Sequence, residues 1–102
     1  MNVKKQISAD NKTITISVEE RFDFSAHQSF KEAYVNHNTP GSLFVLDLSK
    51  ASYMDSSALG MILLLKDHVE NVSGQLKIVK PNDAVNKILE IAQFHRLMTI
   101  ER

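Results

Sequence analysis

The sequence of 102 residues has no cysteine and only three glycines, and these two absences exclude several kinds of site. Without cysteine there is neither a disulfide framework nor a thiolate metal site, which is typical of proteins that work in a reducing cytosol. The three glycines lie far apart and cannot form a glycine-rich phosphate loop. The four histidines do not have the spacing of metal ligands either. We therefore expect no metal and no cofactor.

An excess of charge of one sign is also lacking, because twelve basic residues balance twelve acidic ones. Nucleic-acid-binding proteins usually carry a basic patch, and the nearest approach to one here is the pair Lys4 and Lys5. The longest apolar run, Met61 to Leu65, falls far short of the roughly 20 residues of a membrane span. The N-terminal residues carry no apolar signal segment. These features predict a cytoplasmic protein that binds neither nucleic acid nor membrane.

What the sequence does contain is a regular succession of apolar patterns. Alternating apolar residues predict strands, and apolar residues spaced by three and four predict helices. The expected elements are strands at 4–8 and 12–19, a helix from Asp23 or Ser25 to about His37, a strand at 43–48, a helix at 56–71, a strand at 75–79, a helix that starts at Asn82 or Asp83, and a strand at 97–100. The strand at 43–48 has few polar side chains, which is typical of a strand covered on both faces.

This order of elements implies crossover connections between strands. At 102 residues the chain is long enough for one core and too short for two, so residues 1–102 are expected to form one α/β domain. We expect a mostly parallel or mixed sheet of about four to five strands, with about three to four helices packed on it. Binding sites in such sheets lie beyond the carboxyl ends of strands. Two segments in such places are Phe22–Asp23 and Asp55–Ser56.

The most informative segment is Tyr53–Gly60, where Asp55, Ser56 and Ser57 gather at the start of an apolar helix. Free backbone N–H groups and the positive end of the helix dipole stabilise added negative charge at such a position. Ser56 is therefore placed to carry a phosphate, with Ser57 as the alternative acceptor. A simpler interpretation is helix capping, because Asp and Ser are favoured N-cap residues. The same alternative applies to Asp23 before the first helix.

The helix at 56–71 carries more apolar residues than one buried stripe requires. The inner stripe is expected to consist of Leu59, Ile62, Leu63, Lys66 (through its stem) and Val69. The surplus residues are Met61, Leu64 and Leu65. An exposed apolar patch beside a modifiable serine would indicate a protein-docking surface. The alternative is that both faces of this helix are covered within the domain.

A serine at a strand-to-helix turn also occurs in hydrolases, whose nucleophile elbow reads Gly-x-Ser-x-Gly. The segment Met54–Ala58 has neither glycine, and nothing in the sequence requires His27 or His68 to lie near Ser56. We therefore expect no catalytic residue and no enzymatic activity.

The segment Met54–Gly60 resembles the Asp-Ser-Ser/Thr-Gly-Leu-Gly motif of STAS domains, specifically that of the single-domain anti-sigma factor antagonists. The resemblance covers the whole chain, because the length, the order of elements and the segment Arg21–Asp23 also fit. Two positions depart from the family pattern. Ala58 replaces the usual glycine, which would stiffen the turn, and Glu20 stands where many members have a glycine.

The resemblance implies a switch in transcription regulation. In that family the unphosphorylated domain binds an anti-sigma factor, often a serine-protein kinase, and so frees a sigma factor. Phosphorylation of the first serine of the motif releases the partner, and a PP2C-type phosphatase resets the domain. Carried over to this sequence, the phosphorylation site is Ser56 and the free protein is a monomer. The implied partner-binding residues are Asp23, Asp55, Ser56, Ser57, Ala58 and Met61.

The resemblance leaves one other function open. A STAS domain can also serve as a fixed adaptor in a transporter or signalling complex. In that case Ser56 has no role beyond the helix cap.

Overall fold

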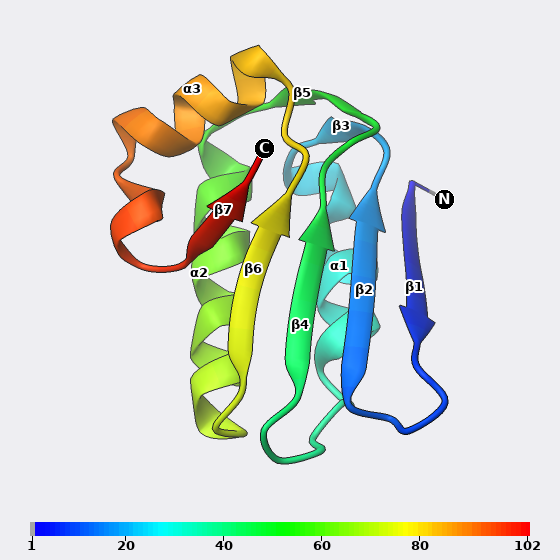
Figure 1. Cartoon of the computed structure of the whole chain (residues 1–102). Helices are drawn as coiled ribbons and strands as arrows, with labels where there is room; N and C mark the ends of the chain where they lie inside the picture. Colours follow the sequence, from blue (N-terminus) through cyan, green and yellow to red (C-terminus); the bar gives the residue numbers. More distant parts are fainter. Residues whose placement is uncertain (1) are drawn as a thin grey trace.

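Five strands form the central sheet, in the order β1-β2-β4-β6-β7 (Figure 1). The structure is a computed structural model that describes residues 2–102. The strands are β1 (Val3–Ile7), β2 (Thr13–Val18), β4 (Leu43–Asp47), β6 (Gln75–Val79) and β7 (Thr99–Glu101). Strand β1 runs antiparallel to β2, and the other neighbouring pairs are parallel. The predicted α/β fold with a mixed, mostly parallel sheet is therefore confirmed.

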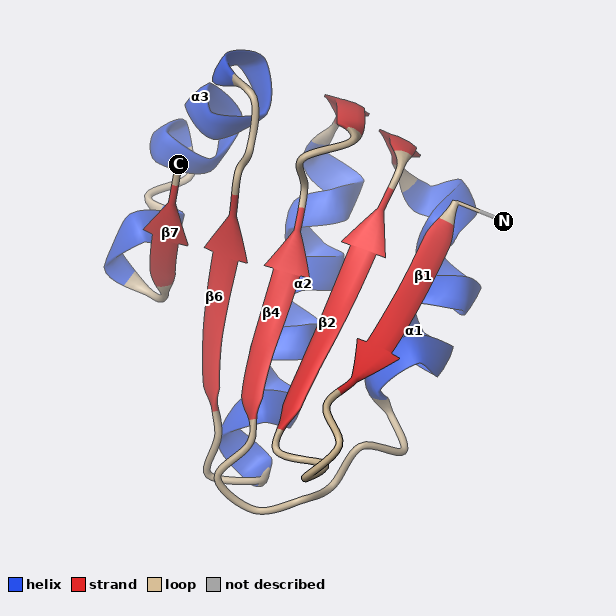
Figure 2. Cartoon of the chain, turned by 45° about the vertical axis from the view of Figure 1, so that its right-hand side comes forward, coloured by secondary structure: helices blue, strands red, loops and turns tan. Residues whose placement is uncertain are grey.

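The two helices that cover this sheet lie on the same face of it (Figure 2). The helical segments are η1 (Phe24–Ala26), α1 (His27–Tyr34), α2 (Ser56–Asn71), α3 (Asp83–Ile91) and η2 (Phe94–Arg96), where η marks a 3₁₀ turn. Helices α1 and α2 lie behind the sheet, and α3 lies at its edge beyond the end of β6 (Figure 1). Among residues 2–102, no helix is long and apolar enough to cross a membrane.

The burial of β4 reflects this one-sided cover. Phe44 and Leu46 are fully buried, whereas Leu43, Val45 and Asp47 are only half-buried. The prediction that this strand is covered on both faces is therefore wrong, because α1 and α2 pack against one face only.

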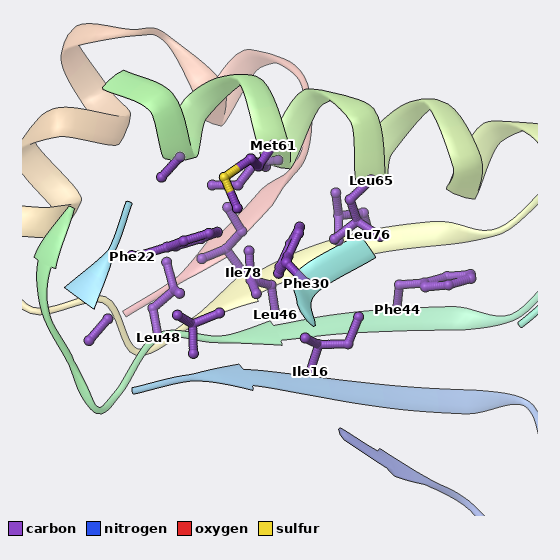
Figure 3. Packing of buried hydrophobic residues seen from close by; sticks show 14 of the residues in the cluster. Ile16, Phe22, Phe30, Phe44, Leu46, Leu48, Met61, Leu65, Leu76 and Ile78 are labelled. Atoms are coloured by element: carbon purple, nitrogen blue, oxygen red, sulfur yellow. The ribbon is translucent and has the colours of Figure 1, made fainter. Parts of the chain in front are cut away.

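The hydrophobic core lies between the sheet and helices α1 and α2 (Figure 3). Phe22 and Phe30 contact each other there, with ring centroids 5.1 Å apart, and Leu46, Ile62 and Ile78 are fully buried beside the same space. Burial of each such side chain contributes about 1.5–3 kcal/mol relative to exposure. The packing of this core fixes the position of α2 on the face of the sheet.

Helix α2 turns a different stripe toward the core from the one that the sequence predicts. Its buried residues are Ala58, Met61, Ile62, Leu65 and Val69. Leu63 and Leu64 are instead 44% and 55% exposed. The prediction is confirmed for Ile62 and Val69, which are buried, and for Leu64, which is exposed. It is wrong for Leu63, Met61 and Leu65, because the buried stripe starts one residue earlier, about 100° around the helix. Of the two alternatives left open for this helix, the exposed apolar patch is the one present, formed by Leu63 and Leu64.

Two short strands are not predicted by the sequence patterns. They are β3 (Glu20–Phe22) and β5 (Ala51–Met54), and they form a separate two-stranded parallel sheet. This small sheet lies beyond the carboxyl ends of β2 and β4 (Figure 1). The chain therefore enters α2 from β5, not directly from the buried strand β4. The last predicted strand, at 97–100, starts two residues later at Thr99, because Leu97 still belongs to the 3₁₀ turn η2 as its C-cap.

Candidate functional site

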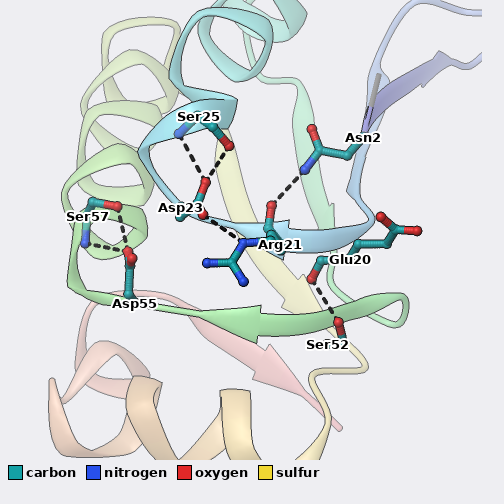
Figure 4. A network of polar contacts seen from close by, with 8 residues as sticks. All are labelled: Asn2, Glu20, Arg21, Asp23, Ser25, Ser52, Asp55 and Ser57. Atoms are coloured by element: carbon teal, nitrogen blue, oxygen red, sulfur yellow. Dashed lines mark hydrogen bonds and ion pairs between the residues drawn. The ribbon is translucent and has the colours of Figure 1, made fainter.

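Strands β3 and β5 place two turns of the same geometry next to each other (Figure 4). Phe22 pairs with Met54, so the residues that follow, Asp23 and Asp55, leave neighbouring strands at the same level. Both aspartates have extended backbone conformations, and each caps the helical segment that follows it. The two predicted carboxylates therefore lie together at the carboxyl end of the sheet, as the sequence suggests.

The Asp55 turn leaves one hydroxyl free. Asp55 Oδ1 accepts hydrogen bonds from the backbone N of Ser57, at 3.0 Å, and from Ser57 Oγ. Ser56, the first residue of α2, is exposed, and its hydroxyl makes no hydrogen bond within residues 2–102. The capping interpretation is thus confirmed for Asp55, while Ser56 contributes no side-chain bond to the cap. The geometry distinguishes Ser56 from Ser57, whose hydroxyl is already bound.

The Asp23 turn repeats this arrangement with a different central residue. Asp23 Oδ1 accepts from the backbone N and the Oγ of Ser25, and Asp23 Oδ2 accepts from Arg21 Nε at 3.1 Å. The Ser25 hydroxyl, and then the Arg21 guanidinium, hold the pKa of the Asp23 carboxyl below its usual value. Phe24 takes the place here that Ser56 has in the other turn, and its side chain is 67% exposed. An exposed aromatic ring therefore lies on the turn beside the free serine.

A stripe of exposed residues continues from Ser56 along α2. Gly60, Leu63 and Leu64 follow Ser56 at intervals of four, seven and eight residues, which places them on the same side of the helix. Leu63 and Leu64 are largely exposed, and an added Cβ at Gly60 would meet no atom within 4 Å. Two exposed leucines therefore lie on the same side of α2 as Ser56, and the space beside Gly60 is open.

The remaining predicted partner-binding residues lie deeper. Ala58 is fully buried and Met61 is 4% exposed, so both side chains belong to the core. The Ala58 side chain is accommodated within the first turn of α2, which explains why an alanine is tolerated where the family pattern has glycine. Gly60, Leu63 and Phe24 form the surface instead. Sequence reasoning missed them, although the helical spacing from Ser56 would have indicated the first two.

His37, which is buried, and His68, which is half-buried, have structural partners away from Ser56. His37 Nε2 lies 3.0 Å from Ser42 Oγ, and His68 Nε2 lies 2.9 Å from the carbonyl oxygen of His37. Burial, followed by the proximity of His68, lowers the pKa of His37. Within residues 2–102, no group of three or more histidine or carboxylate side chains could hold a metal ion.

The exposure of Ser56 leads to a first prediction, on stability. Ser56→Asp is expected to leave the melting temperature within a few degrees of the wild type, because the start of a helix stabilises negative charge. Thermal unfolding followed by circular dichroism measures this. A far larger drop would show that the residue is packed against the domain and would contradict the exposed position described here.

A family model and a sequence relative point to the same domain family. The family model described as the STAS domain matches residues 3–102. A STAS-domain containing protein of Pseudomonas aeruginosa (strain UCBPP-PA14) is 44% identical over 93 residues, which covers 91% of this chain and 92% of that protein.

Solved structures with the same fold include two proteins described as anti-sigma factor antagonists. The unphosphorylated form of the antagonist SpoIIAA matches with a TM-score of 0.80 and 18% identity, over 96% of this chain and 86% of that one. The phosphorylated form of SpoIIAA, a cell fate determinant of Bacillus, matches with a TM-score of 0.67 and 17% identity, over 96% and 89%. An antagonist from Mycobacterium paratuberculosis matches with a TM-score of 0.78 and 15% identity, over 97% and 85%. At this level of identity the likeness shows the fold.

Proposed function

The chain belongs to the STAS domain family, and we propose that it is an anti-sigma factor antagonist controlled by phosphorylation of Ser56. In its unphosphorylated form the domain binds an anti-sigma factor that is also a serine-protein kinase, and so frees a sigma factor. A PP2C-type phosphatase removes the phosphate. The observation that carries the proposal is the Ser56 hydroxyl, which is exposed and unbonded at the first residue of α2.

The helix start explains why such a modification would act on the partner and not on the fold. A phosphate adds about −1.5 to −2 charges at neutral pH. The N-terminus of α2 stabilises this charge by up to about 1 kcal/mol, so the domain keeps its conformation. A partner packed over Ser56 meets this added negative charge, and like charges at an interface cost several kcal/mol.

The residues near Ser56 support a docking surface for a protein. Phe24 and Leu63 are exposed apolar side chains, and Gly60 lets another chain approach the helix closely. Aromatic side chains, phenylalanine included, are enriched in the cores of protein–protein interfaces. In the proposed complex the partner covers the two turns and the first half of α2.

The test of this function, and the second prediction, is the position of the phosphate. The wild-type protein, used as bait in a native lysate, is expected to retain a serine kinase. With that kinase and ATP it should then gain one phosphate, on Ser56. Peptide mapping by mass spectrometry locates the phosphate, and Ser57→Ala is the matched control, which should be labelled like the wild type.

Three results would contradict the proposal. The first is a phosphate on Ser57, and the second is full labelling of Ser56→Ala. The third is retention of transporter or sensory subunits by the wild type and by Ser56→Asp alike, which would indicate a fixed adaptor.

A further inference from the structure

Arg21 holds its guanidinium group between the two turns, above β5 (Figure 4). The central carbon of this group lies 4.3 Å from the centroid of the Tyr53 ring. Its Nε atom donates a hydrogen bond to Asp23 Oδ2 at 3.1 Å. Stacking on an aromatic ring and a bond to a carboxylate together restrict the plane of an arginine side chain. The group is therefore held in one place although its side chain is 62% exposed.

The backbone at Arg21 is fixed on both sides. Asn2 Nδ2 donates to the carbonyl oxygen of Arg21 at 2.7 Å, and the backbone N of Glu20 donates to the carbonyl oxygen of Lys50 at 2.8 Å. The hydroxyl of Ser52 donates to the Glu20 carbonyl (Figure 4). The pairing of β3 with β5 shifts register between Glu20 and Arg21. These bonds fix the backbone of Arg21, and the pairing of β3 with β5 places its side chain over Tyr53 of β5.

The two terminal nitrogens of Arg21 have no hydrogen-bonded partner within residues 2–102. Asp23 already accepts two hydrogen bonds from Ser25, and Asp55 accepts two from Ser57. The stacking partner, Tyr53, lies near the end of β5, three residues before Ser56, the first residue of α2. A cation with free donors thus lies over Tyr53, three residues before the serine that would carry a phosphate, and within the described residues its Nε atom alone is bound, to Asp23.

We propose that Arg21 binds the phosphate of phosphorylated Ser56 through its terminal nitrogens while its Nε atom remains bound to Asp23. This rests on the proposed function, because it concerns the same serine. A guanidinium group can bind a phosphate through two parallel N–H donors. The phosphate is then partly neutralised by the domain's own arginine and is less available to a cation of the partner. Phosphorylation consequently acts as a signal for release and not for docking.

The experiment uses the full chain with phosphoserine installed genetically at position 56, so it does not depend on any kinase. A ³¹P NMR titration measures the second pKa of the phosphate, which is about 6 for an unperturbed phosphoserine. A nearby cation stabilises the doubly charged form and lowers this pKa. In the Arg21→Gln variant the pKa is expected to rise by about 0.5 units or more, and in Arg21→Lys by less.

Arg96→Gln is the matched control. Arg96 is an exposed arginine of η2 that bonds to Gln93, and it lines a groove with Gly74 and Gln75 at the other end of α2. The same loss of charge there should leave the pKa unchanged. An equal pKa in the wild type and Arg21→Gln, or an equal rise in Arg21→Gln and Arg96→Gln, would overturn the proposal. Failure of the proposed function would show separately, as labelling by the kinase at another residue.

Discussion

Replacing Ser56 by aspartate is expected to weaken the complex with the anti-sigma partner at least tenfold, whereas Ser56→Ala should bind like the wild type. A tenfold loss corresponds to about 1.4 kcal/mol, less than the several kcal/mol that like charges cost when an interface brings them together. The alanine variant removes only a hydroxyl that makes no bond within residues 2–102. Titration calorimetry with the purified partner, captured as described above, measures both affinities.

The control for this experiment adds the same charge at the other end of the same helix. Asn71 is exposed and is the last residue of α2, about 22 Å along the helix from Ser56. This separation exceeds the Debye length of about 8 Å at physiological ionic strength. Asn71→Asp should therefore change the affinity little. Equal losses in the two aspartate variants would mean that net charge, and not the Ser56 turn, controls binding.

The long elements of this fold could be predicted because their signals are local. The expected helix at 56–71 and strand at 75–79 match α2 and β6 in both bounds. The strands β3 and β5 could not be predicted in the same way. Each has only three or four residues, too few for a periodic pattern, and each is held by a partner about thirty residues away in the chain. Such strands exist through tertiary pairing.

The orientation of α2 was ambiguous for a related reason. Its middle part carries apolar residues on more than one side, so two stripes fit the helical period almost equally well. Contact with the sheet selects the stripe that contains Met61 and Leu65. The exposed stripe with Leu63 and Leu64 is a consequence of that choice. Local sequence therefore indicated surplus apolar residues on this helix and named Leu64 among them, but it did not identify Leu63 or decide whether the surplus is exposed.

In the candidate site, too, the sequence predicted the local features but not those that depend on tertiary pairing. Sequence patterns located Asp23, Asp55 and Ser56, because caps and motifs are local features. They could not indicate that Phe24 lies at the position equivalent to Ser56, or that Arg21 crosses β5, because both follow from the pairing of Phe22 with Met54.

The structure explains why glycine suits the position of Glu20. Glu20 has a φ of 64°, in the left-handed region where glycine is least strained. The glycine of the family pattern fits this conformation. In this chain a glutamate adopts it, held by the backbone bond to Lys50.

At the turn after α2, glycine is required for close backbone approach and not for a left-handed conformation. The left-handed residue is Ser73, with a φ of 56°, and not Gly74. Gly74 donates its backbone N–H to the carbonyl oxygen of Val69 at 2.9 Å, which closes the end of the helix. A Cβ atom added at Gly74 would lie 2.5 Å from the carbonyl oxygen of Ser42. The position therefore requires glycine because two backbone segments approach each other closely there.

Gly74→Ala is consequently expected to destabilise the domain by about 3 kcal/mol. The contact with Ser42 involves backbone, so one segment must move, and an overpacked site of this kind costs about 1–3 kcal/mol. The hydrogen bond from the backbone N of Gln75 to the same carbonyl oxygen, 3.0 Å long, would be strained as well, at about 1 kcal/mol. The melting temperature should fall by roughly 10–20 °C. Urea unfolding gives the change in free energy directly.

The matched control is the same substitution at Gly60. This glycine lies inside α2, and a Cβ there would meet nothing within 4 Å. Because alanine favours helix over glycine by about 1 kcal/mol, Gly60→Ala should stabilise the domain by about that amount. Opposite signs at the two positions would establish that close backbone approach, and not a general need for flexibility, retains Gly74. Two variants of unchanged stability would contradict the contact on which the argument rests. A stabilised Gly60→Ala variant would also show that Gly60 costs the fold stability, which is consistent with a role in letting a partner approach Ser56.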